Sequence, residues 1–171
     1  MSFGPMRRWG PITGIGRLSL DARIPTARIE NLAQRTVFQA WLSAATTKSG
    51  VAAPIAAALT GAVFEVRQGY KSKDSKRQNA DISNAATAYS SGYLPCLAVL
   101  SSQIDTTVMS RYRERQWTVL TGTVGLNDPL LSTYDFAREI LGYDLAGFFQ
   151  RHKSVLQTEI TLVLQALLTP D

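Results

Sequence analysis

The chain of 171 residues has very little of the chemistry that builds zinc sites or disulfide frameworks. It contains one cysteine, Cys96, and one histidine, His152. A single cysteine forms no internal disulfide, and these two residues are too few for a His/Cys zinc site. Any metal that the protein binds is therefore expected on oxygen ligands.

Sustained apolar runs are also scarce. The uncharged stretch of residues 50–64 is shorter than a membrane span, is interrupted by Pro54, and lies far from the N-terminus, where a signal peptide would stand. We therefore expect a soluble, cytoplasmic protein with no membrane partner. The composition, 45% apolar and 18% charged, is that of an ordinary core-forming chain, and the length fits one domain over residues 1–171.

Acidic residues are absent from position 31 to position 64. After this gap Glu65, Asp74 and Asp81 follow within seventeen positions, and residues 67–77 hold five positive charges and one negative charge. The net charge of +5 is therefore concentrated in one segment. A local positive field of this kind fits a phosphate-rich partner.

Apolar periodicity and turn residues predict an α/β order. Residues 1–26 mix glycine, proline and arginine and are expected to form an irregular arm. Strand patterns cover residues 62–69, 94–101 and 117–122. Helical patterns cover residues 27–45, 51–60 (expected to be buried), 77–90, 105–115, 131–141, 144–152 and 154–168. Short right-handed crossovers would make the sheet at least partly parallel, so we predict a central mixed sheet flanked by helices.

The strand pattern at residues 62–69 (AVFEVRQG) carries a pair of opposite charges. Alternation along a strand places Glu65 and Arg67 on the same face, about 7 Å apart along the strand axis. Hydrolysis of a phosphodiester needs a carboxylate to hold a hard divalent cation and a nearby positive charge to stabilise the phosphorane. The pair satisfies both requirements. Asp81, on the following predicted helix, could bring a further carboxylate back to the pair.

The string VFEVRQGYKSKDSKRQNADISNAATAYSSGYLPCLAVLSSQID resembles the active-site core of type II restriction endonucleases of the PD-(D/E)xK nuclease superfamily. The resemblance covers about residues 62–145, and YKSKDSKRQNAD at 70–81 is its most specific part. Glu65 and Arg67 occupy the place of the family's (D/E)-x-K step. Asp81, fourteen residues after Arg67, occupies the place of a helix-borne carboxylate that binds metal in some members.

The resemblance implies a restriction-endonuclease-like fold whose active-site core spans residues 62–122, followed by C-terminal helices at 131–168. It also implies a homodimeric restriction enzyme that cuts a short sequence in double-stranded DNA with Mg²⁺. Glu65 and Asp81 would bind the metal, and Arg67 with Lys71 or Lys73 would stabilise developing charge. The side chains expected to approach DNA are Lys76, Arg77, Gln78 and Asn79.

Two positions depart from the family pattern. The family lysine is Arg67 here, and a guanidinium keeps its proton at working pH, so proton relay would fall to Lys71 or Lys73. The family also places an aspartate on a preceding strand, and residues 31–64 supply none. Either Glu30 or Asp21 folds back to the site, or the site relies on Glu65 and Asp81 alone.

Simpler interpretations stand beside these. Glu65 and Arg67 could form a solvated ion pair, and Lys71–Arg77 a solvated loop. The chain would then be a noncatalytic DNA-binding module derived from a nuclease, or a protein-interaction domain. The remaining candidates are expected to be structural, with Arg111, Arg113 and Arg115 on the surface, His152 near a helix end and Cys96 packed in a strand.

Overall fold

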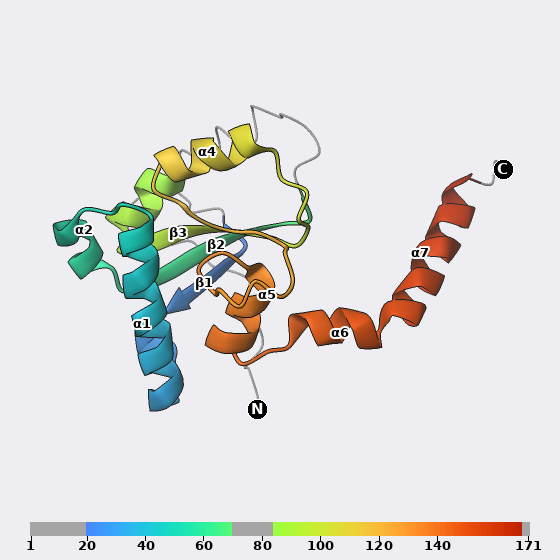
Figure 1. Cartoon of the computed structure of the whole chain (residues 1–171), viewed down its shortest axis with the longest axis horizontal. Helices are drawn as coiled ribbons and strands as arrows, with labels where there is room; N and C mark the ends of the chain where they lie inside the picture. Colours follow the sequence, from blue (N-terminus) through green and yellow to red (C-terminus); the bar gives the residue numbers. More distant parts are fainter. Residues whose placement is uncertain (1–19, 70–83, 169–171) are drawn as a thin grey trace.

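The computed structural model describes residues 20–69 and 84–168, and within them the chain forms a mixed α/β domain. Its sheet has four strands in the order β1-β2-β3-β4, namely Ala22–Pro25, Gly61–Arg67, Tyr93–Val99 and Thr118–Leu120. Strands β2, β3 and β4 are parallel, and β1 pairs antiparallel with β2. Figure 1 shows helices on both sides of this sheet. The predicted mixed sheet flanked by helices is confirmed.

Strand β1 corrects the expectation of an irregular arm over residues 1–26. Residues 22–25 pair with residues 61–64, with Ala22 opposite Phe64 and Pro25 opposite Gly61. Four residues are too short for a recognisable period of two, so only pairing with β2 defines this strand. Pro25 is tolerated because it ends a strand at the sheet's edge. Residues 1–19 of the expected arm lie outside the described residues.

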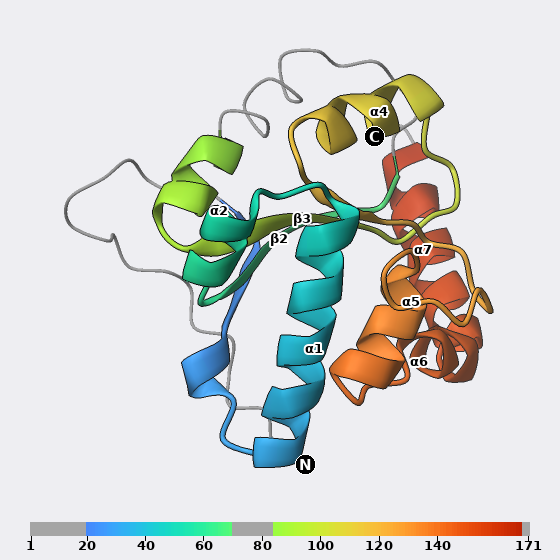
Figure 2. The same cartoon turned by 60° about the vertical axis from the view of Figure 1, so that its left-hand side comes forward.

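One face of the sheet packs against helix α1 (Leu32–Lys48) and the helical turns α5 (Thr133–Asp135) and η2 (Phe136–Ile140). Figure 2 shows α1 crossing this face. The core between α1, η2 and this face of the sheet is aromatic. The ring centroids of Trp41 and Phe136 are 4.6 Å apart, and those of Phe64 and Phe136 are 5.3 Å apart. The Trp41 indole N–H donates to the carbonyl of Pro129 at 2.9 Å, so the loop before α5 is tied to α1.

The other face packs against helix α4 (Thr106–Glu114) and the helical residues 84–90. Tyr112 of α4 meets Trp117 edge to face, with the ring centroids 5.2 Å apart, and both belong to the core that includes Leu97 and Val99 of β3. Asp105 caps α4 as predicted, because its carboxylate accepts from the Thr107 N–H at 2.8 Å. Strand β3 is buried on both faces, which confirms its interpretation as a central strand.

Three predicted helices differ from the structure. The helix predicted at 131–141 is shorter, and it consists of one α-helical turn, α5, followed by the π-helix η2. The helix predicted at 27–45 begins later, at Leu32, because the Asn31 side chain accepts from the Gln34 N–H and caps it there. The preceding residues Thr26–Arg28 form a 3₁₀ turn, η1. The short helix predicted at 51–60 exists as α2 (Ala53–Ala58), but it is not buried. Its alanines indicate helix propensity, which says nothing about burial.

The C-terminal part continues as helices α6 (Leu145–Arg151) and α7 (Lys153–Leu168), close to their predicted ranges. Figure 1 shows that α6 and α7 lead away from the sheet, and that α7 stands apart from the rest of the domain. None of the helices in the described part of the chain is both long enough and apolar enough to span a membrane.

Candidate functional site

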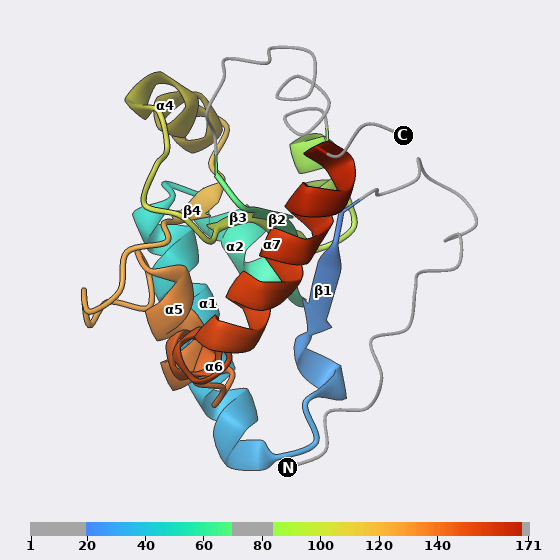
Figure 3. The same cartoon turned by 90° about the vertical axis from the view of Figure 1, so that its right-hand side faces the viewer.

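The candidate site lies where the three parallel strands end. Because β1 runs antiparallel to β2, the beginning of β1 lies beside the end of β2 at this same end of the sheet. Figure 3 shows β1 along the side of the sheet next to β2. In open α/β sheets, ligands bind at the carboxyl ends of the parallel strands. We call the side chains gathered here, Asp21, Glu65 and Arg67, the strand-end site.

Glu65 and Arg67 share one face of β2, as the alternation predicts. Glu65 pairs in register with Leu97 and Arg67 with Val99, and both partners belong to the core beneath α4. The Arg67 guanidinium forms an ion pair with the Glu65 carboxylate. The Glu65 side chain is 6% exposed and that of Arg67 is 18% exposed. The simpler interpretation as a solvated ion pair is therefore wrong, because this pair is largely removed from water.

Asp21 brings a second carboxylate to the end of β2. Its Oδ2 accepts a hydrogen bond from the backbone N–H of Val66 at 2.8 Å, directly after Glu65 in the chain. Asp21 is exposed, whereas Glu65 is buried. Glu30 lies beyond Pro25, which pairs with Gly61 at the other end of β2. Of the two residues that could fold back, the structure therefore brings Asp21, not Glu30, beside Glu65.

The backbone around the strand-end site is closely packed. The Leu100 N–H donates to the Arg67 carbonyl at 2.8 Å, and the Gly122 N–H donates to the Ser101 carbonyl at 3.1 Å. These bonds tie together the chain segments that leave β2, β3 and β4. The site therefore rests on rigid strand ends rather than on a long unsupported loop.

Sequence reasoning missed two hydroxyl side chains near these strand ends, and it also missed Arg23 on β1. The Thr133 hydroxyl donates to the Val99 carbonyl at 2.7 Å, and the Tyr134 hydroxyl donates to the Leu100 carbonyl at 2.9 Å. The run of hydroxyl residues at the start of α5 was the available signal. Arg23 shares the face of Glu65, but its guanidinium lies over the ring of Tyr93, 5.3 Å from the centroid, and Tyr93 begins β3 at the other end of the sheet. No sequence signal indicated Arg23, because β1 itself was not recognised.

The other predicted site residues lie outside the described residues. They are the candidate cations and DNA contacts of one segment, together with the second predicted metal ligand: Lys71, Lys73, Lys76, Arg77, Gln78, Asn79 and Asp81. Within residues 20–69 and 84–168, no three His, Cys, Asp or Glu side chains come together as a metal-binding group. The described part of the site therefore offers two carboxylates, those of Asp21 and Glu65.

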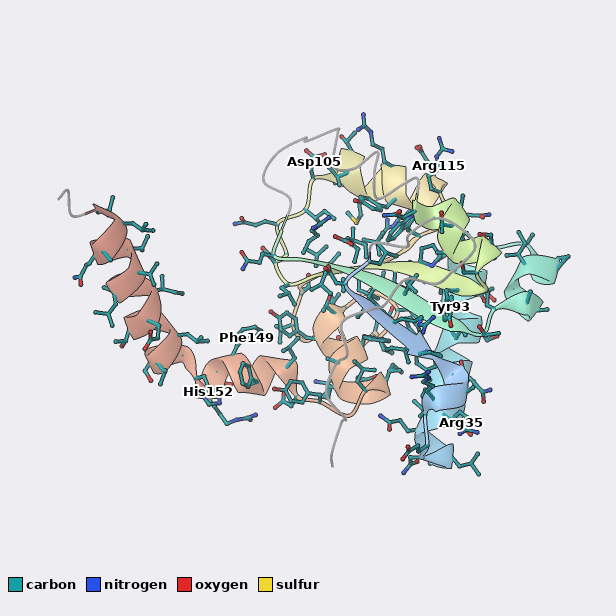
Figure 4. The ribbon with its side chains drawn as sticks, turned by 180° about the vertical axis from the view of Figure 1, so that it is seen from behind. Arg35, Tyr93, Asp105, Arg115, Phe149 and His152 are labelled. Carbon is teal, nitrogen blue, oxygen red and sulfur yellow. The ribbon has the colours of Figure 1, made fainter. Side chains whose placement is uncertain are left out.

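A cavity of about 570 Å³ lies elsewhere, between α1, α2 and η1. Hydroxyl, amide and apolar side chains line it, together with Arg35, whose Nε donates to the Ile29 carbonyl at 2.8 Å. Figure 4 shows Arg35 on α1, far from Asp105 at the start of α4. This cavity opens on the α1 side of the sheet, whereas the Glu65 and Arg67 side chains lie on the α4 side. It is therefore separate from the strand-end site.

The residues expected at structural positions lie where the sequence predicts them. Arg111, Arg113 and Arg115 are exposed on or just after α4, and Figure 4 places Arg115 at the opposite end of that helix from Asp105. His152 is exposed and ends α6, with its ring 4.7 Å from that of Phe148. Cys96 is fully buried in β3, and burial raises the pKa of its thiol, which keeps the sulfur protonated and inert.

Comparison of the chain with protein-family models, curated proteins and solved structures finds no match.

Proposed function

We propose that the chain is a Mg²⁺-dependent endonuclease that hydrolyses phosphodiester bonds in double-stranded DNA, in the manner of a restriction enzyme. The observation that carries the proposal is the hydrogen bond from the Val66 N–H to Asp21. It holds the carboxylate of Asp21, the residue before β1, against the backbone of β2 at the position after the buried Glu65, which forms an ion pair with Arg67. The resemblance to the nuclease superfamily implies an aspartate from a preceding strand, and Asp21 is the residue that fits.

The donor set at the strand-end site suits a hard divalent cation. Asp21 and Glu65 offer carboxylate oxygens, which Mg²⁺ prefers, and the described residues there bring no sulfur or imidazole that would select zinc. Asp21 and Glu65 would hold the ion, with Asp81 as a further candidate from the neighbouring sequence. When bound, the metal supplies Lewis-acid polarisation of the phosphate and a more acidic water.

Arg67 would act as a fixed positive charge. A guanidinium remains protonated at any working pH, so it stabilises negative charge on phosphate oxygens and takes no proton. Its ion pair with Glu65 holds it at the strand-end site before substrate arrives. Proton relay would then belong to Lys71 or Lys73, which follow in the sequence.

The basic sequence that follows β2 is the proposed route to DNA. Residues 67–77 carry five positive charges and one negative charge, and in the sequence they begin at the last residue of the strand that holds Glu65. Lysine and arginine contacts to phosphates supply most nonspecific affinity for DNA. Lys76, Arg77, Gln78 and Asn79 are the proposed contacts, and the amides of Gln78 and Asn79 can pair with adenine.

One observation favours a second candidate, a noncatalytic DNA-binding module. Glu65 is already neutralised by Arg67, and a buried ion pair of this kind also serves a purely structural role. In that case the basic segment would bind DNA while no bond is broken. Cleavage and binding must therefore be measured separately.

The experiment is a nicking assay on supercoiled plasmid with Mg²⁺. Asp21→Asn and Glu65→Gln remove a negative charge while keeping the shape, and the amide oxygen introduced by Asp21→Asn can still accept from the Val66 N–H. Each should reduce cleavage by at least about 100-fold, because each removes a metal ligand. Glu30→Gln is the matched control, since Glu30 is an exposed acid beyond the other end of β1, and it should cleave like wild type.

Binding of a DNA duplex at several salt concentrations distinguishes the alternatives. A wild type that binds with a steep salt dependence but never cleaves would support the noncatalytic module and overturn the enzyme. For each phosphate contacted, the logarithm of affinity should fall by about 0.9 per unit of log salt. A flat response with no cleavage would leave the protein-interaction domain.

A further inference from the structure

Helix α7 (Lys153–Leu168) has an apolar surface that nothing in the described chain covers. All of its residues are exposed. Figures 1 and 4 both show the helix standing away from the sheet, with its side chains projecting into open space. The large apolar side chains on it are between 37% and 79% exposed: Val155, Leu156, Ile160, Leu162, Val163, Leu164, Leu167 and Leu168.

The composition of α7 indicates that it needs a packing partner. A helix of 16 residues is marginal in water without tertiary contacts. Five of its residues are valine, isoleucine or threonine, whose branched side chains lower helix propensity. The helix is therefore not held by its own backbone preferences, and burial of its apolar surface is the remaining source of stability.

The spacing of four apolar residues matches the seam of a coiled coil. Leu156, Ile160, Val163 and Leu167 are separated by four, three and four positions, which is the alternation of core positions in a heptad. The set is also symmetric about its own midpoint, between Thr161 and Leu162. Two copies of the helix that cross antiparallel at this midpoint would place Ile160 against the other copy's Val163, and Leu156 against its Leu167.

The charges of α7 fit a second copy better than a membrane surface. Its only charged residues are Lys153 and Glu159, and neither lies in the four-residue seam. Two antiparallel copies therefore bring no like charges together. A helix that lies on a membrane surface carries lysines and arginines along its polar face, whereas the polar residues here are serine, threonine and glutamine apart from that one pair.

We propose that α7 is a self-association helix that pairs antiparallel with α7 of a second copy through Leu156, Ile160, Val163 and Leu167. A twofold axis through the midpoint of the helix makes this interface self-complementary. The proposal does not depend on nuclease activity, and its readout, the mass of the particle, is independent of cleavage.

The experiment measures the mass of the full chain by sedimentation equilibrium over a range of concentrations. Wild type should reach twice the 18.7 kDa of one chain and dissociate on dilution. Ile160→Lys and Val163→Lys should each raise the dissociation constant at least about tenfold, because each places a lysine in the apolar seam. Thr158→Lys, which adds the same charge on the opposite side of the helix, is the control and should change it less than about twofold.

A charge pair tests the direction of pairing. The double variant Ile160→Lys with Val163→Glu places Lys against Glu twice across the axis of an antiparallel dimer, so it should recover association lost by either single lysine variant. In a parallel dimer the same variant would set Lys against Lys and would not recover. Fluorescence of the buried Trp41 and Trp117 monitors the fold of the sheet and its helices, from which α7 stands apart (Figure 1).

Several results would overturn the proposal. A wild type that stays monomeric up to its solubility limit would do so, as would a dimer that Ile160→Lys leaves unchanged. Equal loss with Thr158→Lys would show that the whole helix is buried and that this seam is not the interface. A monomer that binds vesicles of anionic lipid through α7 would assign the helix to a membrane surface.

Discussion

Gly122 lies just after β4, where its backbone passes closest to the end of β3. A Cβ atom at this position would stand 2.3 Å from the carbonyl carbon of Leu100 and 2.4 Å from its oxygen. Both are backbone atoms, so no side-chain rotation relieves the contact. Replacing Gly122 by alanine must therefore separate the ends of the two strands, and it would stretch the hydrogen bond from the Gly122 N–H to Ser101.

The loss in free energy of unfolding caused by Gly122→Ala follows from these two effects. Forcing an extra carbon into a closely packed region costs about 1–3 kcal/mol. Weakening the hydrogen bond to Ser101 adds about 1 kcal/mol. We therefore expect Gly122→Ala to lower the free energy of unfolding by about 2–4 kcal/mol. Gly50→Ala is the matched control, because a Cβ atom at Gly50 would meet no other atom within 4 Å, and the φ of Gly50 is +68°. That variant carries only the left-handed strain of a non-glycine residue, about 1 kcal/mol.

Urea unfolding measures both variants. The buried Trp41 and Trp117 report the transition by fluorescence, and an unchanged slope against urea concentration would show that the change lies in stability alone. If Gly122→Ala cost no more than Gly50→Ala, the close approach of the strand ends would be refuted. The strand-end site would then not be held rigid by closely packed backbone.

Three further results are expected. Trp41→Phe should lower the free energy of unfolding by about 2 kcal/mol, because the Pro129 carbonyl loses its donor and the aromatic core loses volume; circular dichroism measures it. Asp105→Ala should lower it by about 1 kcal/mol by removing the cap of α4, whereas Asp105→Asn should keep most of it. Burial raises the pKa of the Cys96 thiol above its ordinary value of 9.0, so the folded state keeps a proton that the unfolded chain loses. The stability that this proton contributes should therefore be constant below that pH and be lost above it, so urea unfolding should show a smaller fall above pH 9.0 in Cys96→Ala than in wild type. A thiol reagent should label Cys96 only after unfolding.

Local patterns were sufficient for most of the secondary structure. Strand β3 was recognisable because a continuous apolar run fits a strand buried on both faces. Helix α4 was recognisable because Asp105 precedes it and caps its first turn. Helices α6 and α7 were found within one or two residues of their predicted ranges. In each case the signal lies within the element itself.

In the candidate site, too, the sequence determined the local arrangement and the tertiary structure determined the burial. Two residues on one strand must share a face when they are two apart, so the sequence determined that Glu65 and Arg67 lie together. It did not determine how far they are removed from water, because the packing of α4 and β3 around them decides that.

Only the tertiary structure decided that Asp21, rather than Glu30, stands beside Glu65. Strand β1 has four residues and no pattern of its own, and its register is set by hydrogen bonds to β2, about forty residues later. The exposure of α7 was likewise undetermined, since an apolar helix has the same sequence pattern whether its own domain or another chain covers it. Periodicity and caps act between neighbours in the chain and can be read from it, whereas strand pairing and burial depend on which distant segments meet.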